Sequence, residues 1–123
     1  MYLVGGEHPN KPRAQRFLQR VQDRELDACT NTEVLQEILY RYWALGQREF
    51  ACHVYDLFVA ACPVVLAVML ADTDRARDLL RAVPGISTRD AIHAGVMMNH
   101  NVEWVATFDS DFDRVPGISL LPL

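Results

Sequence analysis

The chain has little of several residue types, and each shortage narrows the possible functions. Its 123 residues include one lysine, Lys11, and Lys and Arg together number 12 against 16 Asp and Glu. At a net charge of −4 the chain has no general basic surface for nucleic acid, so any such contact must come from a local basic patch. Candidate residues are Lys11, Arg13, Arg16, Arg20, Arg41 and Arg48; the alternative is a set of solvated helix faces.

Cysteine is also scarce, and long hydrophobic runs are missing. The cysteines, Cys29, Cys52 and Cys62, are odd in number, show no CxxC spacing, and are not spaced with the four histidines as zinc ligands. Together with the lack of a signal-peptide pattern, this predicts a protein of the reducing cytoplasm whose cysteines are small buried side chains. No apolar stretch reaches the ~18 residues of a membrane span, so no membrane segment is predicted.

The chain alternates amphipathic segments with short apolar ones. Apolar residues at three- and four-residue spacing predict helices over about 12–21, 30–44, 47–61, 72–83 and 87–99. Thr30 with Glu33, and Ser87 with Asp90, fit capping boxes that begin two of these helices. Apolar runs predict strands at 26–29, 63–68, 104–107 and 118–120, the second and third of them buried. The pattern indicates an α/β fold with a mainly parallel, helix-covered sheet, in a single domain.

Three carboxylates follow the predicted strand at 104–107, at Asp109, Asp111 and Asp113. The carboxyl edge of an open α/β sheet is where ligands bind, and clustered acids repel one another unless a cation neutralises them. The alternative is an Asp-rich loop that caps the next turn.

Two more acids lie on predicted helices. Glu37 lies among apolar residues in the sequence, where burial of a lone carboxylate costs free energy. The alternative is that Glu37 is a surface side chain beside the buried stripe. Asp90 lies in the first turn of its helix, where an acid can also serve only as a cap. Taken together, acids on two helices and one strand end favour a hard cation such as Mg²⁺ or Mn²⁺.

Three segments of the sequence match a known pattern in order and spacing: TEVLQEI at 32–38, RDAIHA at 89–94 and ATFDSDFDRVPGI at 106–118. They resemble the PIN-domain family, and in particular the VapC-type toxins of bacterial toxin–antitoxin pairs. The resemblance implies a three-layer α/β/α domain and an endoribonuclease dependent on Mg²⁺ or Mn²⁺. It implies that Glu37, Asp90 and Asp109 hold the metal, with Asp111 as a fourth catalytic ligand and Thr107 as a nearby polar group. The implied partners are an RNA substrate, a small cognate antitoxin and a second copy of the chain in a homodimer.

The chain departs from the family at its beginning. PIN domains open with a strand that ends in Asp, typically followed by Thr or Ser, and no such strand and acid are found here. We therefore expect residues 1–123 to form a single PIN-like domain that is N-terminally incomplete, with its first strand and acid encoded upstream of Met1. Loss of a central strand and a ligand predicts poor stability and little or no nuclease activity.

The missing acid also leaves a second hypothesis, a catalytically inactive PIN-like domain that binds RNA or a protein. A third, a phosphoacceptor domain of response-regulator type, would need a paired Asp near the start and a late Lys, whereas Lys11 is early.

Aromatic residues gather between the second and third predicted helices, at Tyr40, Tyr42, Trp43 and Phe50. They are either core residues or a surface for the antitoxin or a second copy, because exposed aromatic patches tend to mark interfaces. Trp43 and Trp104 could stack on bases, but packing in the core or an interface is the favoured interpretation.

Overall fold

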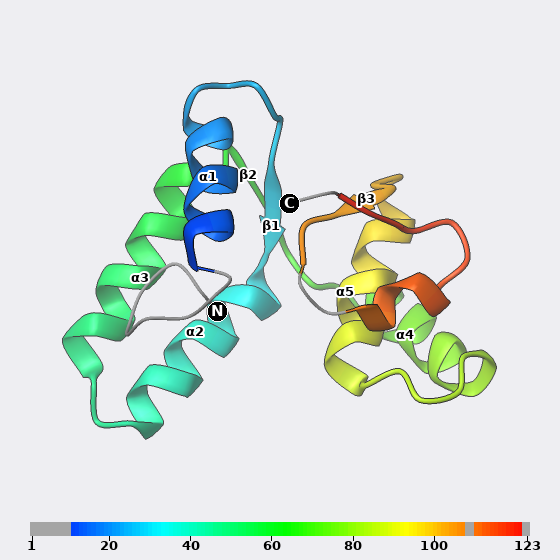
Figure 1. The fold of residues 1–123 in the computed structure, drawn as a ribbon. Helices are drawn as coiled ribbons and strands as arrows, with labels where there is room; N and C mark the ends of the chain where they lie inside the picture. The colour runs from blue at the N-terminus through cyan, green and yellow to red at the C-terminus, as the bar shows by residue number, and fades with distance from the viewer. Residues whose placement is uncertain (1–10, 108–109, 122–123) are drawn as a thin grey trace. The chain divides into compact units, whose positions relative to one another are not determined.

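The computed structural model of the chain describes residues 11–107 and 110–121, without the side chains of Lys11, Ala14, Ser110 and Asp111. The described residues divide into two compact units, with the division between Leu66 and Ala67. Each unit combines helices with a pair of short parallel strands (Figure 1).

The first unit contains three helices and two strands. They are α1 (Lys11–Gln22), β1 (Cys29–Asn31), α2 (Thr32–Ala44), α3 (Arg48–Ala61) and β2 (Val64–Leu66). Strands β1 and β2 pair in parallel, with Cys29 opposite Val64, and the three helices lie to one side of them in Figure 1. The core packs α2 against α3 and contains Leu35, Ile38, Tyr42, Ala51 and Val54.

The second unit contains α4 (Leu70–Ala82), α5 (Thr88–Asn99), β3 (Trp104–Val105), the 3₁₀ helix η1 (Ser110–Arg114) and β4 (Ser119–Leu120). Strands β3 and β4 pair in parallel. Helices α4 and α5 pack side by side, and small residues such as Ala76, Ala91 and Ala94 let their backbones approach closely. The core of this unit is completed by Phe112 of η1 and by Val115 and Ile118, which follow η1 in the chain.

The beginnings of two helices test the predicted caps. Ser87 caps α5 as predicted, because its side chain accepts a hydrogen bond from the Asp90 N–H at 3.1 Å. The prediction that Thr30 caps α2 is wrong, because Thr30 is paired opposite Val65 within the β1–β2 sheet. Asn31 caps α2 instead, accepting from the Val34 N–H at 3.0 Å.

Helix α4 begins at Leu70, earlier than the predicted start at Asp72 or Thr73. The Asp72 carboxylate accepts a hydrogen bond from the Met69 N–H at 2.8 Å, which places Asp72 inside the first turn. An acid that bonds back to the residue before a helix extends the helix toward its N-terminus.

The strands are shorter and more exposed than predicted. Strand β1 lies at 29–31 and not at 26–29, and Val64 and Val65 of β2 are 49% and 36% exposed. The expectation of a strand buried on both faces is therefore wrong; β2 has β1 as its only partner among the described strands. Trp104, expected in a buried strand, is 57% exposed because β3 is a two-residue strand paired with β4 alone in the described sheet.

The cysteines also depart from the expected burial. Cys29 and Cys52 are exposed, and Cys62 is half-buried at the end of α3. Burial raises the pKa of the Cys62 thiol, and the neighbouring Cys29 raises this pKa further. Cysteine was expected to behave as a small apolar residue, but two of the three lie on solvated positions of β1 and α3.

The aromatic residues of α2 and α3 divide between core and surface. The Tyr42 ring is buried edge-to-face against Phe50, with ring centroids 5.0 Å apart. Tyr40 and Trp43 are exposed, and the Arg48 guanidinium lies 5.0 Å from the centroid of the Trp43 ring. The core interpretation is thus confirmed for Tyr42 and wrong for Trp43.

The α/β class and the short parallel sheets are confirmed. Within residues 11–107 and 110–121 the longest helix, α3, has 14 residues, fewer than the roughly 20 that a membrane-spanning helix needs.

Candidate functional site

Glu37 lies on the second turn of α2, in the first unit. Its neighbours Leu35 and Ile38 are buried in the core, and Glu37 itself is half-buried beside them. The Asn31 cap fixes the start of α2 and so the direction in which this face of the helix points. Glu37 is thus neither fully buried nor fully exposed, and its role as a ligand stays a prediction.

Asp90 lies in the first turn of α5, in the second unit. The Ser87 side chain binds its backbone N–H, and the carboxylate is half-buried at the positive end of the helix dipole. Ala91 and Ala94 of α5 are both fully buried and pack the helix against the core of the second unit. This placement keeps Asp90 on a rigid element, as a ligand or catalytic carboxylate requires.

The acids of the third segment follow β3. Asp109 lies outside the described residues, and Asp111 lies in η1, where its side chain is not described. Phe112 and Val115, 4% and 2% exposed, anchor η1 in the core of the second unit. Asp113, the last of the three acids, is exposed in the same short helix.

The structure brings two of the predicted segments together. Helix α5, which carries Asp90, contacts η1, which carries Asp111. Glu37 belongs to the other unit, and its position is described within that unit alone. Among the side chains that the structure describes, no group of three or more His, Cys, Asp or Glu is placed to hold a metal ion.

The structural role of one acid, Asp72, was not predicted from the sequence. Asp72 is 2% exposed and accepts hydrogen bonds from the Met69 N–H and the Asn99 side-chain amide, each at 2.8 Å. The Arg75 guanidinium in turn donates to the Asn99 carbonyl oxygen at 2.7 Å. This chain of bonds ties the start of α4 to the end of α5. The sequence signal was an acid three residues after Met69, which was interpreted only as a helix start.

The sequence model of the PIN domain matches residues 1–118, most of the chain. The chain belongs to the PIN-domain family. The match includes all three segments on which the resemblance was based, and it confirms that interpretation.

Relatives of this PIN domain are similar along almost their whole length. The chain is 40% identical over 121 residues to VapC ribonuclease Mb1869c of Mycobacterium bovis, covering 98% of the chain and 92% of that protein. Ribonuclease VapC13 of Mycobacterium tuberculosis shows the same identity and coverage. Ribonuclease VapC23 of Mycobacterium tuberculosis is 31% identical over 109 residues, covering 89% of the chain and 86% of that protein. No solved structure matches the chain.

Proposed function

We propose that this PIN domain is an endoribonuclease, the toxin of a toxin–antitoxin pair, that hydrolyses RNA phosphodiester bonds. The observation that carries the proposal is the 40% identity over 98% of the chain to proteins named VapC ribonucleases. The acids of the chain fit this activity, because the family match covers every segment that supplies them.

The proposed active site contains Glu37, Asp90, Asp109 and Asp111, which act as ligands of Mg²⁺ or Mn²⁺. Their donors are carboxylate oxygens, and the two described ones are half-buried, as suits a hard cation that retains several waters. When bound, such an ion lowers the pKa of water and stabilises the negative charge on the phosphate under attack. The Asn31 and Ser87 caps orient α2 and α5 and thereby the carboxylates of Glu37 and Asp90.

Both units are proposed to belong to one PIN domain. The family match runs through residues 1–118 and continues across the division between Leu66 and Ala67. The proposed partners are an RNA substrate, a small cognate antitoxin and a second copy in a homodimer, with the cytoplasm as the proposed location. Exposed Tyr40 and Trp43 on α2 offer an apolar surface for a protein partner.

A second candidate is a catalytically inactive PIN domain that binds RNA or a protein. It is favoured by one observation: Tyr40 and Trp43 of α2 are exposed, and an exposed aromatic surface can bind a protein without any catalytic step.

A cleavage assay on the full chain separates these candidates. With a mixed-sequence single-stranded RNA and Mg²⁺ or Mn²⁺, we expect slow cleavage that stops in EDTA and in Asp90→Asn and Asp109→Asn. Asp113→Asn is the matched control, since it makes the same change at an exposed acid of the same segment and should cleave like the parent. RNA binding without cleavage in either metal would support the inactive domain and contradict the nuclease.

A further inference from the structure

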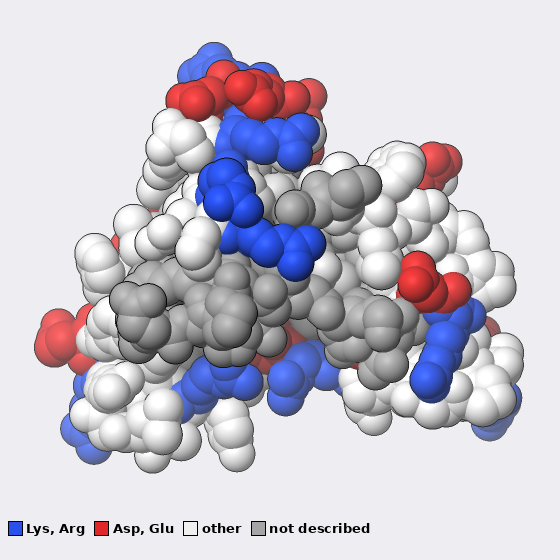
Figure 2. Space-filling view, viewed as in Figure 1, with Lys and Arg blue, Asp and Glu red and all other residues white. Residues whose placement is uncertain are grey.

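Helix α1 has a charge unlike that of the rest of the chain. It contains four of the chain's 12 basic residues, Lys11, Arg13, Arg16 and Arg20, and none of its 16 acids. Since the chain has a net charge of −4, everything outside this helix sums to −8. Figure 2 shows basic side chains gathered over α1, with acidic ones beyond its end. The helix is therefore a local basic surface on an acidic protein.

The three arginines form a row. At 3.6 residues per turn, Arg13, Arg16 and Arg20 fall within an arc of about 60° and span about 10 Å along the helix axis. Val21, which is buried, fixes which side of α1 faces the protein. Arg13 and Arg16 are exposed, and the Arg20 side chain is 44% exposed. A row of guanidinium groups of this length can meet successive groups of a linear polyanion.

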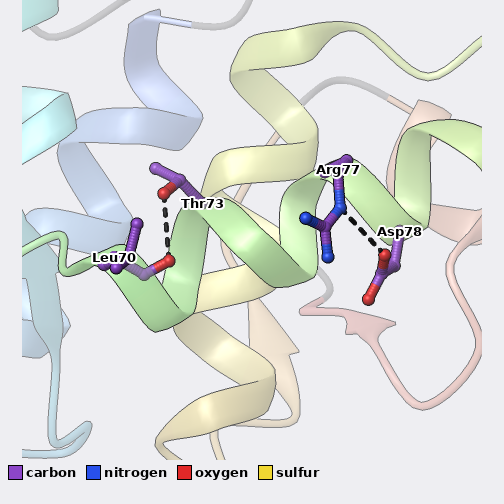
Figure 3. A network of polar contacts seen from close by, with 4 residues as sticks. All are labelled: Leu70, Thr73, Arg77 and Asp78. Atoms are coloured by element: carbon purple, nitrogen blue, oxygen red, sulfur yellow. Dashed lines mark hydrogen bonds and ion pairs between the residues drawn. The ribbon is translucent and has the colours of Figure 1, made fainter.

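Helix α4 provides a contrast within the same chain. It also has three arginines, Arg75, Arg77 and Arg81, but it contains three acids as well. Arg77 forms an ion pair with the adjacent Asp78 at 3.2 Å (Figure 3). The charge of α4 therefore sums to zero, and an extended anion gains nothing from approaching it. A mixed surface of this kind is ordinary for a solvated helix, whereas α1 concentrates one sign of charge.

We propose that α1 is a docking surface for the phosphate backbone of RNA, with Arg13, Arg16 and Arg20 as the phosphate-binding residues. This proposal rests on the proposed ribonuclease function in one respect, because that function is the reason for taking RNA as the ligand. A chain of net charge −4 repels RNA at long range, so productive approach needs a local basic region that steers the backbone. Contacts to phosphates position a nucleic acid and carry no base sequence, so α1 anchors RNA without selecting its target.

Glu25 limits the strength of this surface. Its carboxylate lies 3.4 Å from the Arg20 guanidinium nitrogen, just beyond the end of α1. In the free protein Glu25 holds the third guanidinium of the row, and an RNA phosphate at Arg20 would compete with it. Removal of the Glu25 charge should therefore strengthen the surface.

The test is the binding of a fluorescent 20-nucleotide mixed-sequence RNA to the full chain, in EDTA and over a series of salt concentrations. Each phosphate contact to a single strand contributes about 0.7 to the slope of log affinity against log salt. For the double variant R13Q/R16Q we expect a slope shallower by about 1.4 and, at 0.1 M salt, affinity about twentyfold weaker. The charge-conserving R13K/R16K should bind within about threefold of the parent, since a phosphate contact needs a positive charge.

The matched control is R77Q/R81Q, which removes the same two charges from exposed positions of α4. It should change neither the slope nor the affinity by more than about twofold. Equal losses in both double variants would show that only net charge matters, and no loss in R13Q/R16Q would show that RNA does not use α1; either result overturns the proposal. Circular dichroism of each variant verifies that α1 and the remaining helices are folded.

Glu25→Gln supplies a test in the opposite direction. It should tighten RNA binding by about twofold to fivefold, because Arg20 becomes available to a phosphate. Glu103→Gln, an equal charge change at an exposed position of the second unit, should have a smaller effect. A competitor of poly-glutamate that displaces RNA from the parent at equal charge concentration would assign α1 to acidic protein partners and overturn the RNA proposal.

These measurements in EDTA are independent of cleavage. Loss of binding in R13Q/R16Q from a chain that never cleaves RNA would support the docking surface while contradicting the nuclease. Cleavage by the parent together with unchanged RNA binding in R13Q/R16Q would support the nuclease and contradict the docking surface.

Discussion

Asp72 is a buried carboxylate that holds two helices together. It accepts hydrogen bonds from the Met69 N–H and from the Asn99 amide, and both bonds are 2.8 Å long. Asp72→Ala leaves both donors of these partly buried bonds without this acceptor, and loss of a hydrogen-bond partner away from bulk water costs about 1–3 kcal/mol. We expect a loss of about 2–4 kcal/mol in the free energy of unfolding, measured by urea denaturation.

Asp74→Ala is the control for Asp72→Ala. Asp74 lies on the same helix and is exposed, so its replacement should change the free energy of unfolding by less than about 0.5 kcal/mol. Equal effects at the two positions would mean that the network around Asp72 does not stabilise the second unit.

Individual residues were predictable from sequence where the signal was local. The Ser87 cap depends on four consecutive residues and was predicted. Thr30 was wrongly assigned as a cap, because its pairing with Val65 involves a segment 35 residues away. The role of Asp72 was missed for the same reason, since its partner Asn99 lies 27 residues on.

At the scale of elements, the contact between α4 and α5 depends on a glycine. A Cβ on Gly95 would lie 2.6 Å from the Asp72 carbonyl oxygen, closer than real Cβ atoms come to backbone. On an open helix, Gly→Ala stabilises by about 1 kcal/mol. At Gly95 we expect the opposite sign, because the added methyl forces the helices apart at a cost of about 1–3 kcal/mol.

Thermal and urea unfolding of Gly95→Ala measure directly whether the added methyl group lowers or raises the free energy of unfolding. A lower melting temperature is the expected result. A variant more stable than the parent would show that α4 and α5 are not in close backbone contact at Gly95.

The helices were predicted more accurately than the strands, for a physical reason. A helix of 12 or more residues repeats its apolar period several times, and the ends of α3 and α5 fall within a residue or two of the prediction. The strands have two or three residues each, so their positions depend on pairing with distant segments. Apolar runs predicted their existence but not their length or their exposure.

At the scale of the whole molecule, the family was predictable because its signal consists of motifs in order along the chain. The match over residues 1–118 confirms it. The arrangement of the candidate acids could not be predicted in this way, because Glu37 and Asp90 are separated by 53 positions and lie in different units. The sequence therefore indicated the residue types of the site, and the roles of these residues stay predictions.

The most direct test of the central claim is titration of the full chain with Mn²⁺ by calorimetry, for the parent, Asp90→Asn and Asp113→Asn. Loss of an outer-shell partner already costs about 10–100-fold in metal affinity, so loss of a ligand should cost no less. We predict that Asp90→Asn binds Mn²⁺ at least about tenfold more weakly than the parent, and that Asp113→Asn binds like the parent. Equal Mn²⁺ affinity in the parent and Asp90→Asn, or no saturable binding by the parent, would contradict the account.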